Sequence, residues 1–120
     1  MRHRLAAIDG LDSTQGLLIA RNRLEFYARL LSLFLEHHAD DPRRLRQLTQ
    51  DGDTAALQGV AHALKGVAGN IGASRVRVLA ESVLAALHGE AQDANSQALG
   101  LADELEQLVR QLRHALDSDE

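Results

Sequence analysis

The residues best suited to chemistry lie in one short segment, AHALKGVAGNIGA, near the middle of the chain. It places Lys65 three positions after His62, and Gly66 and Gly69 follow the histidine at helical spacing. A glycine in a helix interior costs about 1 kcal/mol relative to alanine, so repeated glycines beside a histidine need a reason. We predict that these glycines keep the approach to His62 open, because they leave the imidazole on a nearly bare backbone.

The direction of His62 follows from helical periodicity. At about 100° per residue, with Leu64 at the centre of the buried face, His62 points about 160° away, toward solvent. An exposed imidazole is largely uncharged at neutral pH, which leaves one ring nitrogen free as a nucleophile. Lys65, one helical turn later, would offset the negative charge of a phosphoryl group placed on that nitrogen. These residues predict phosphoryl chemistry at His62.

The segment needs a helix to position it, and that helix has a complete buried face without the histidine. The side chains expected within roughly 60° of Leu64 are Leu57, Val60, Ala61, Val67, Ala68 and Ile71. The line that points outward carries Ala55, Gly59, His62, Gly66 and Gly69.

The sequence pattern predicts helices along the rest of the chain as well. Its 120 residues are 45% hydrophobic, with only three aromatic side chains, so Leu, Ala and Val must build one modest core. Ser13, Asn22, Asp41 and Asp53 are expected to cap the starts of successive helices. The predicted helices span residues 14–20, 23–39, 42–50, 54–70, 75–88 and 96–116, with a polar linker over 90–96 and an unanchored start over 1–12. We expect an all-α antiparallel four-helix bundle with short accessory helices.

Composition excludes several classes of function. The chain has no cysteine, which rules out disulfides and thiolate metal sites, and its net charge of −4 gives no global reason to expect nucleic-acid binding. No apolar run approaches the roughly 18 residues of a transmembrane span. The start has too short an apolar stretch for a signal peptide. We therefore expect a cytoplasmic domain without direct membrane contact, tethered to a membrane only through a parent protein.

The segment HALKGVAGNIGA resembles the signature of histidine-containing phosphotransfer (HPt) domains, in which Leu-Lys-Gly and a Gly-Ala turn follow a histidine. The resemblance covers about residues 11–116 and implies one HPt domain over 1–120, of the type found at the end of bacterial hybrid sensor kinases. It implies a four-helix bundle whose histidine takes a phosphoryl group from an aspartate of one receiver domain and passes it to an aspartate of another. A domain of this family has no kinase activity of its own.

The resemblance extends to individual positions. His62 matches the phosphorylated histidine, Lys65 the basic residue that assists the phosphoryl group, and Gly66 the glycine that keeps the approach open. The expected receiver-docking surface consists of Gln58, Gly59, Gly66 and Gly69. The implied partners are receiver domains of a hybrid kinase or of response regulators, met by a monomer. No metal or cofactor is expected on this domain, because the receiver supplies the divalent metal. Some members of the family have a further polar or basic residue on the next helix that faces the histidine. No residue of this sequence is assigned to that position.

Other readings of the same residues are weaker. A kinase dimerisation domain would carry His-Glu/Asp-Leu-Arg-Thr-Pro, whereas Ala-Leu-Lys-Gly follows His62. The glycines do not fit a dinucleotide or Walker pattern, and no strand is expected before them. His37 and His38 are adjacent and point to different helix faces, and we expect them, like His3, His88 and His114, to be solvated rather than metal ligands. The alternative that remains open is a helical interaction module without chemistry, which docks a partner through its glycine face.

Overall fold

The computed structural model describes residues 1–89 and 93–117, and every regular element among them is an α-helix. This confirms the all-α prediction. The helices are α1 (Arg2–Ala6), α2 (Ser13–Ile19), α3 (Leu24–His38), α4 (Asp41–Asp51), α5 (Thr54–Ile71), α6 (Ser74–Leu87) and α7 (Ala94–Asp117). None of these helices is long and apolar enough to cross a membrane.

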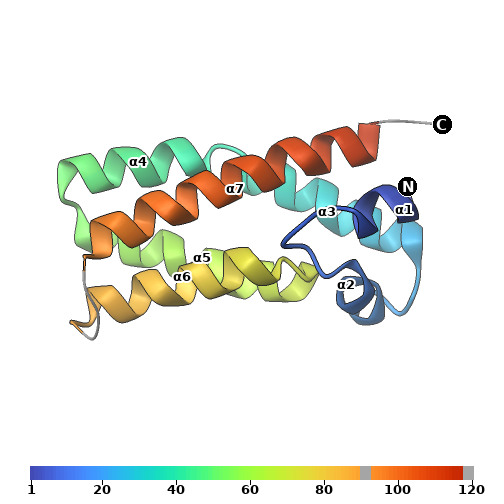
Figure 1. Ribbon diagram of the computed structural model, residues 1–120, viewed down its shortest axis with the longest axis horizontal. Helices are drawn as coiled ribbons and strands as arrows, with labels where there is room; N and C mark the ends of the chain where they lie inside the picture. Colours follow the sequence, from blue (N-terminus) through green and yellow to red (C-terminus); the bar gives the residue numbers. More distant parts are fainter. Residues whose placement is uncertain (90–92, 118–120) are drawn as a thin grey trace.

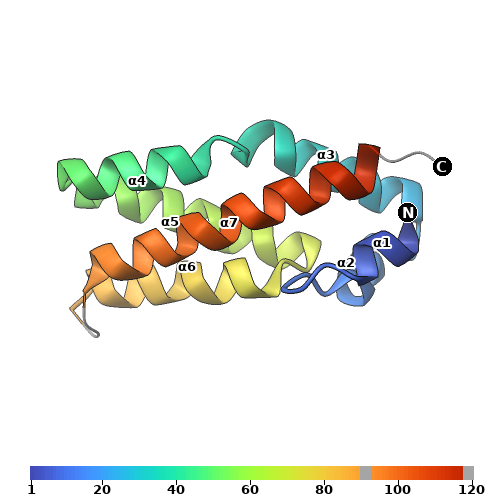
Figure 2. The same cartoon turned by 45° about the horizontal axis from the view of Figure 1, so that its top comes forward.

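The long helices form an elongated bundle of 44 × 22 × 20 Å. Helix α5 packs against α4 and α6, and α7 closes the bundle by packing against the same two helices. Figures 1 and 2 show α3 and α4 following each other along one side of the bundle, with α1 and α2 at the end where both termini lie. Helix α3 contacts α5 and α7, so the broken pair α3–α4 acts as one side of the core.

Aliphatic side chains fill the core, as the composition predicts. Its largest fully buried side chains are Tyr27, Phe34, Leu5, Leu31, Leu45, Leu57, Leu64, Leu101, Leu105, Leu108 and Leu112. The phenol of Tyr27 donates a 2.7 Å hydrogen bond to the carbonyl of Ile71, so the one buried tyrosine oxygen is satisfied at the end of α5. A Cβ at Gly16 would collide with the Tyr27 ring, which explains the glycine in α2.

The end of α5 depends on a second glycine. Gly72 follows the helix with φ +78°, a left-handed conformation that L side chains rarely adopt. A Cβ at Gly72 would also collide with the main-chain oxygen of Asp12. In the other direction, the Asp12 amide donates a 2.7 Å hydrogen bond to the Gly72 carbonyl. The loop before α2 therefore packs directly on the turn that ends α5.

Two of the predicted caps can be compared with side-chain geometry. Asp53 caps α5 as predicted, because its carboxylate accepts a 3.1 Å hydrogen bond from the Ala56 amide. The cap of α2 was predicted at Ser13, which is wrong by one residue. Asp12 is the cap and accepts a 3.0 Å hydrogen bond from the Gln15 amide, while Ser13 is the first helical residue. Both residue types suit this position, so the sequence alone did not separate them.

The other two caps also shift. Asn22 adopts φ +59°, a left-handed turn conformation for which asparagine is well suited, and the residue that precedes α3 is Arg23. Asp41 is the first residue of α4, and Asp40 takes the cap position without accepting a hydrogen bond from a main-chain amide of the helix. Pro42 therefore still lies in the first turn, where its missing amide proton leaves no helical hydrogen bond unmade.

The start of the chain is anchored, contrary to the prediction. Residues 2–6 form α1, and Leu5, Ile8 and Leu11 are buried in the core. Arg4 Nε donates a 3.0 Å hydrogen bond to the Ala115 carbonyl of α7. At the other end of the predicted linker, α7 begins at Ala94 rather than Ser96. Residues 90–92 of that linker lie outside the described residues.

Candidate functional site

The outer face of α5 carries the residues that the sequence singled out. Leu64 and its predicted neighbours Leu57, Val60, Ala61, Ala68 and Ile71 are buried, and Val67 is half-buried, which confirms the predicted inward stripe. His62 is exposed, as its angle predicted. The helix is long enough to hold this face because Asp53 caps its start and Gly72 ends it.

Two glycines near His62 are not required by the fold. Gly59 and Gly66 are both exposed, and a Cβ on either would meet no atom within 4 Å outside its own stretch of helix among the described residues. Neither has a positive φ that would require glycine. Each costs about 1 kcal/mol of helix propensity relative to alanine, and packing returns none of it. The open surface around His62 is therefore not a by-product of how the helices pack.

Gly69 continues the same face but has a close neighbour. It is half-buried, and a Cβ there would lie 3.5 Å from Cδ of Arg77 in α6, an ordinary contact distance. Arg77 is exposed and forms a 3.2 Å ion pair with Glu81. A hollow of about 380 Å³ lies here, and its walls include Gln15 of α2 as well as Gly69 and Arg77. Arg77 is thus a basic residue of the next helix that lies at the edge of the glycine face, a residue that sequence reasoning left unassigned.

The polar side chains of the face make no hydrogen bond or ion pair with any residue that the structure describes. Gln58 and Lys65 are exposed, one turn before and one turn after His62. Within the described residues, Lys65 makes no hydrogen bond and no ion pair. Its ammonium is the nearest cation along the helix to His62, and a mobile lysine side chain can reach a group bound one turn away. The predicted site residues therefore share one exposed helical face.

Sequence reasoning missed the side of the site that α3 and α4 provide. A hollow of about 400 Å³ opens between α4 and α5, and its walls include Gly59 and Ala63 of α5 and Arg44 of α4. Gly59 precedes His62 by about one turn and Ala63 follows it directly, so the hollow lies beside the part of α5 that carries the histidine, although His62 is not in its wall. Arg44 was not among the predicted residues, because nothing in the local pattern of α4 shows which groove it faces.

His37 and His38 also line this hollow, and the prediction that both are simply solvated is wrong for His38. His38 is half-buried, its Nδ1 lies 2.8 Å from Oδ2 of Asp41, and its ring lies against Phe34. The contact spans the break between α3 and α4, which explains why helical periodicity within either helix did not show it. His37 remains exposed. Among the described residues no group of three histidine or acidic side chains is placed to hold a metal ion.

Comparison with known proteins identifies one family. The family model described as the Hpt domain matches residues 29–119, a span that contains α4, α5, α6 and the whole glycine face. No curated protein and no solved structure matches the chain.

Proposed function

Since the chain belongs to the Hpt domain family, whose members carry out histidine phosphotransfer in two-component signalling, we propose that His62 is its phosphorylated residue. In this proposal His62 accepts a phosphoryl group from the aspartate of one receiver domain and passes it to the aspartate of another. The observation that carries the proposal is the bare surface around His62: it is exposed between Gly59 and Gly66, whose missing side chains serve no packing purpose. A partner domain can therefore bring its own reacting group directly to the imidazole.

The chemistry is a displacement at phosphorus. A ring nitrogen of neutral His62 attacks the phosphorus of the aspartyl phosphate, and a nitrogen–phosphorus bond forms while the bond from phosphorus to the aspartate oxygen breaks. The carboxylate leaves as an anion, and the positive charge left on the ring is relieved by loss of the other ring proton to solvent. In the reverse step the ring takes a proton back from solvent, the aspartate carboxylate of a second receiver attacks the phosphorus, and the nitrogen–phosphorus bond breaks to regenerate the neutral histidine. No oxidant, reductant or nucleotide takes part.

Lys65 has an electrostatic role in this proposal. Negative charge lies on the phosphoryl oxygens and develops on the leaving carboxylate as the group moves, while the entering nitrogen becomes positive. An ammonium one turn from the imidazole lowers the energy of that arrangement, because it faces the phosphoryl oxygens and pairs with no described residue. The divalent metal that aspartate chemistry uses is assigned to the receiver, so this domain supplies the nucleophile and one cation. We place the domain in the cytoplasm as a monomer, beside the receivers of a hybrid kinase or of response regulators.

The direct test is labelling by a phosphorylated receiver. The chain is incubated with a panel of receiver domains charged with phosphate, and phosphohistidine is detected by mass spectrometry at neutral or alkaline pH, where the bond survives. We expect His62→Gln to abolish labelling while the helical circular dichroism signal stays intact. His114→Gln, which changes an exposed histidine of α7, is the control and should be labelled like the wild type.

Two results would contradict the proposal. Labelling that persists in His62→Gln would move the site to another histidine. Receivers that bind the wild-type chain without ever labelling it would favour an interaction module without chemistry.

A further inference from the structure

The hollow between α4 and α5 extends the face around His62 onto a second helix. Gly59 belongs both to the glycine face of α5 and to the wall of this hollow, so the two surfaces are continuous. A partner domain that docks over His62 and extends toward α4 therefore reaches the mouth of the hollow. The side chains of α4 in its wall are Asp41 and Arg44, and those of α3 are His37 and His38.

The two formally charged side chains in the wall of the hollow, Asp41 and Arg44, do not pair with each other. Asp41, the one carboxylate in the wall, contacts His38 instead, with its Oδ2 lying 2.8 Å from Nδ1 of that histidine. Arg44 is exposed, and its guanidinium makes no hydrogen bond or ion pair with any described residue. A guanidinium carries five N–H donors in a planar fork that matches a carboxylate in two parallel hydrogen bonds. The hollow therefore presents the guanidinium of Arg44, which has no described partner, on the helix that packs beside the one carrying His62.

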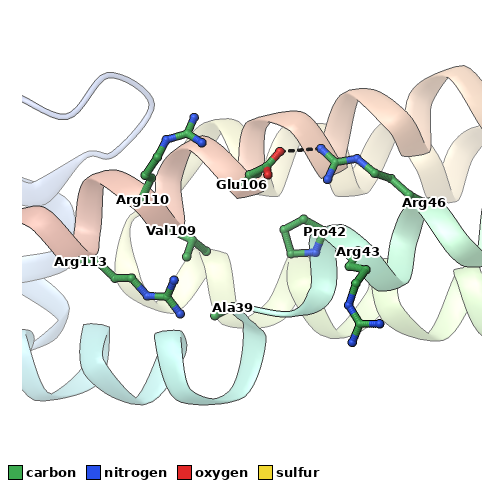
Figure 3. A pocket seen from close by; sticks show the side chains of 8 residues that line it. All are labelled: Ala39, Pro42, Arg43, Arg46, Glu106, Val109, Arg110 and Arg113. Atoms are coloured by element: carbon green, nitrogen blue, oxygen red, sulfur yellow. Dashed lines mark hydrogen bonds and ion pairs between the residues drawn. The ribbon is translucent and has the colours of Figure 1, made fainter.

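The neighbouring arginine shows the contrast. Arg43 lines a different hollow, of about 260 Å³, between α4 and α7, where Pro42 and Val109 are among the apolar side chains (Figure 3). Arg43 pairs with Asp40 at 2.6 Å. Arg46 pairs with Glu106 at 2.7 Å across the same hollow, as Figure 3 shows. These two α4 arginines thus have carboxylates within the chain, whereas Arg44, on the side of α5, has none among the described residues.

We propose that Arg44 is a second recognition point for the receiver domain and binds a carboxylate side chain on the receiver surface that docks over His62. The inference rests on the proposed function, because it names a contact made by the same partner. Its physical reason is desolvation: a partner that covers Arg44 removes water from the guanidinium, and a covered charge without a counter-charge weakens binding. A receiver with a carboxylate at this place binds more tightly than one without, so Arg44 helps to select the partner.

The experiment compares two adjacent arginines of one helix. The probe is the receiver domain that labels the wild-type chain fastest in the transfer assay. Its dissociation constant is measured by titration calorimetry at low and high salt for the wild type, Arg44→Gln, Arg44→Lys and Arg43→Gln. We expect Arg44→Gln to weaken binding roughly 5- to 20-fold at low salt, which corresponds to a charged hydrogen-bonded contact. Arg44→Lys should recover part of the loss, and Arg43→Gln should stay within about twofold of the wild type, since a solvent-exposed ion pair contributes little.

A second readout separates docking from chemistry. Phosphoramidate, a small phosphoryl donor that needs no docking surface, should label all four proteins equally, and transfer from saturating receiver should proceed at the wild-type rate in Arg44→Gln. Equal affinities for Arg44→Gln and Arg43→Gln would overturn the inference and leave the proposed function intact. A slower transfer step at saturation with unchanged affinity would also overturn it, because Arg44 would then act on the phosphoryl group. A wild-type chain that neither receivers nor phosphoramidate label at His62 would refute the proposed function itself.

Discussion

Tyr27 and Ile71 join α3 to the end of the helix that carries His62. The phenol donates a 2.7 Å hydrogen bond to the Ile71 carbonyl, and both residues are buried. Ile71 is the last residue of α5, where carbonyls lack helical partners, so the phenol satisfies a group that would otherwise be buried without one. The position of the outer face of α5 thus depends on a contact between residues 44 apart in the sequence.

The first prediction concerns that hydrogen bond. Tyr27→Phe should lower the free energy of unfolding by about 1–2 kcal/mol, because it leaves the Ile71 carbonyl buried without a donor while it keeps the ring. Chemical denaturation followed by circular dichroism measures the change. Transfer at His62 should persist in the folded variant, because Tyr27 takes no part in the chemistry. A variant as stable as the wild type would show that the phenol contributes nothing net.

The second prediction follows from the titration of the same phenol. Burial, with a smaller contribution from the charge of Asp12, raises the pKa of Tyr27 to about 12. The unfolded chain has an ordinary tyrosine pKa near 10, so the folded state holds the proton more tightly. Stability from this group is fully present below about pH 10 and is lost between about pH 10 and 12, by at most about 1.4 kcal/mol per pH unit.

A spectroscopic measurement tests this directly, because Tyr27 is the only tyrosine and the chain has no tryptophan. Tyrosinate absorbance of the folded protein should rise with a midpoint well above 10, and the same titration in denaturant should return to about 10. Tyr27→Phe should lack the extra alkaline loss of stability. A folded-state midpoint near 10 would contradict the assignment.

The third prediction tests the open approach to His62. Gly66→Gln should stabilise α5 by roughly 0.5–1 kcal/mol and yet slow transfer from a receiver, because a long side chain would stand beside the imidazole. Gly100→Gln is the matched control: Gly100 is exposed in α7, and a Cβ there also meets nothing within 4 Å among the described residues. The control should gain similar stability and transfer at the wild-type rate. Equal transfer by both variants would refute the role assigned to the bare surface.

The fourth prediction separates chemistry from docking at Lys65. Lys65→Ala should reduce the transfer rate at saturating receiver roughly 5- to 30-fold, because the ammonium acts on charge that accumulates during transfer and water screens it at an open site. Receiver affinity should change little, and so should stability, since the side chain is exposed and has no described partner. Single-turnover kinetics and titration calorimetry provide the two values. If affinity alone fell, Lys65 would be a docking residue.

The sequence by itself determined the features that depend on one helix at a time. The stripe around Leu64, the outward direction of His62 and the Asp53 cap all follow from the 3.6-residue period and from local hydrogen bonding, which need no knowledge of other helices. The motif around His62 also predicted the family, and the family-model match over residues 29–119 confirms that prediction. The exact caps of α2, α3 and α4 were misplaced by one residue, because several adjacent side chains suit a helix start.

The tertiary structure decided everything that depends on how helices meet. The His38–Asp41 contact crosses a helix break, and the groove that Arg44 faces is set by how α4 lies against α5. The start of the chain, read as unanchored, is held by the burial of Leu5 and by the hydrogen bond from Arg4 to α7. A periodic pattern states which side of a helix is buried, but the partner of each exposed side chain depends on the angles and positions of neighbouring helices, which packing of the whole core sets.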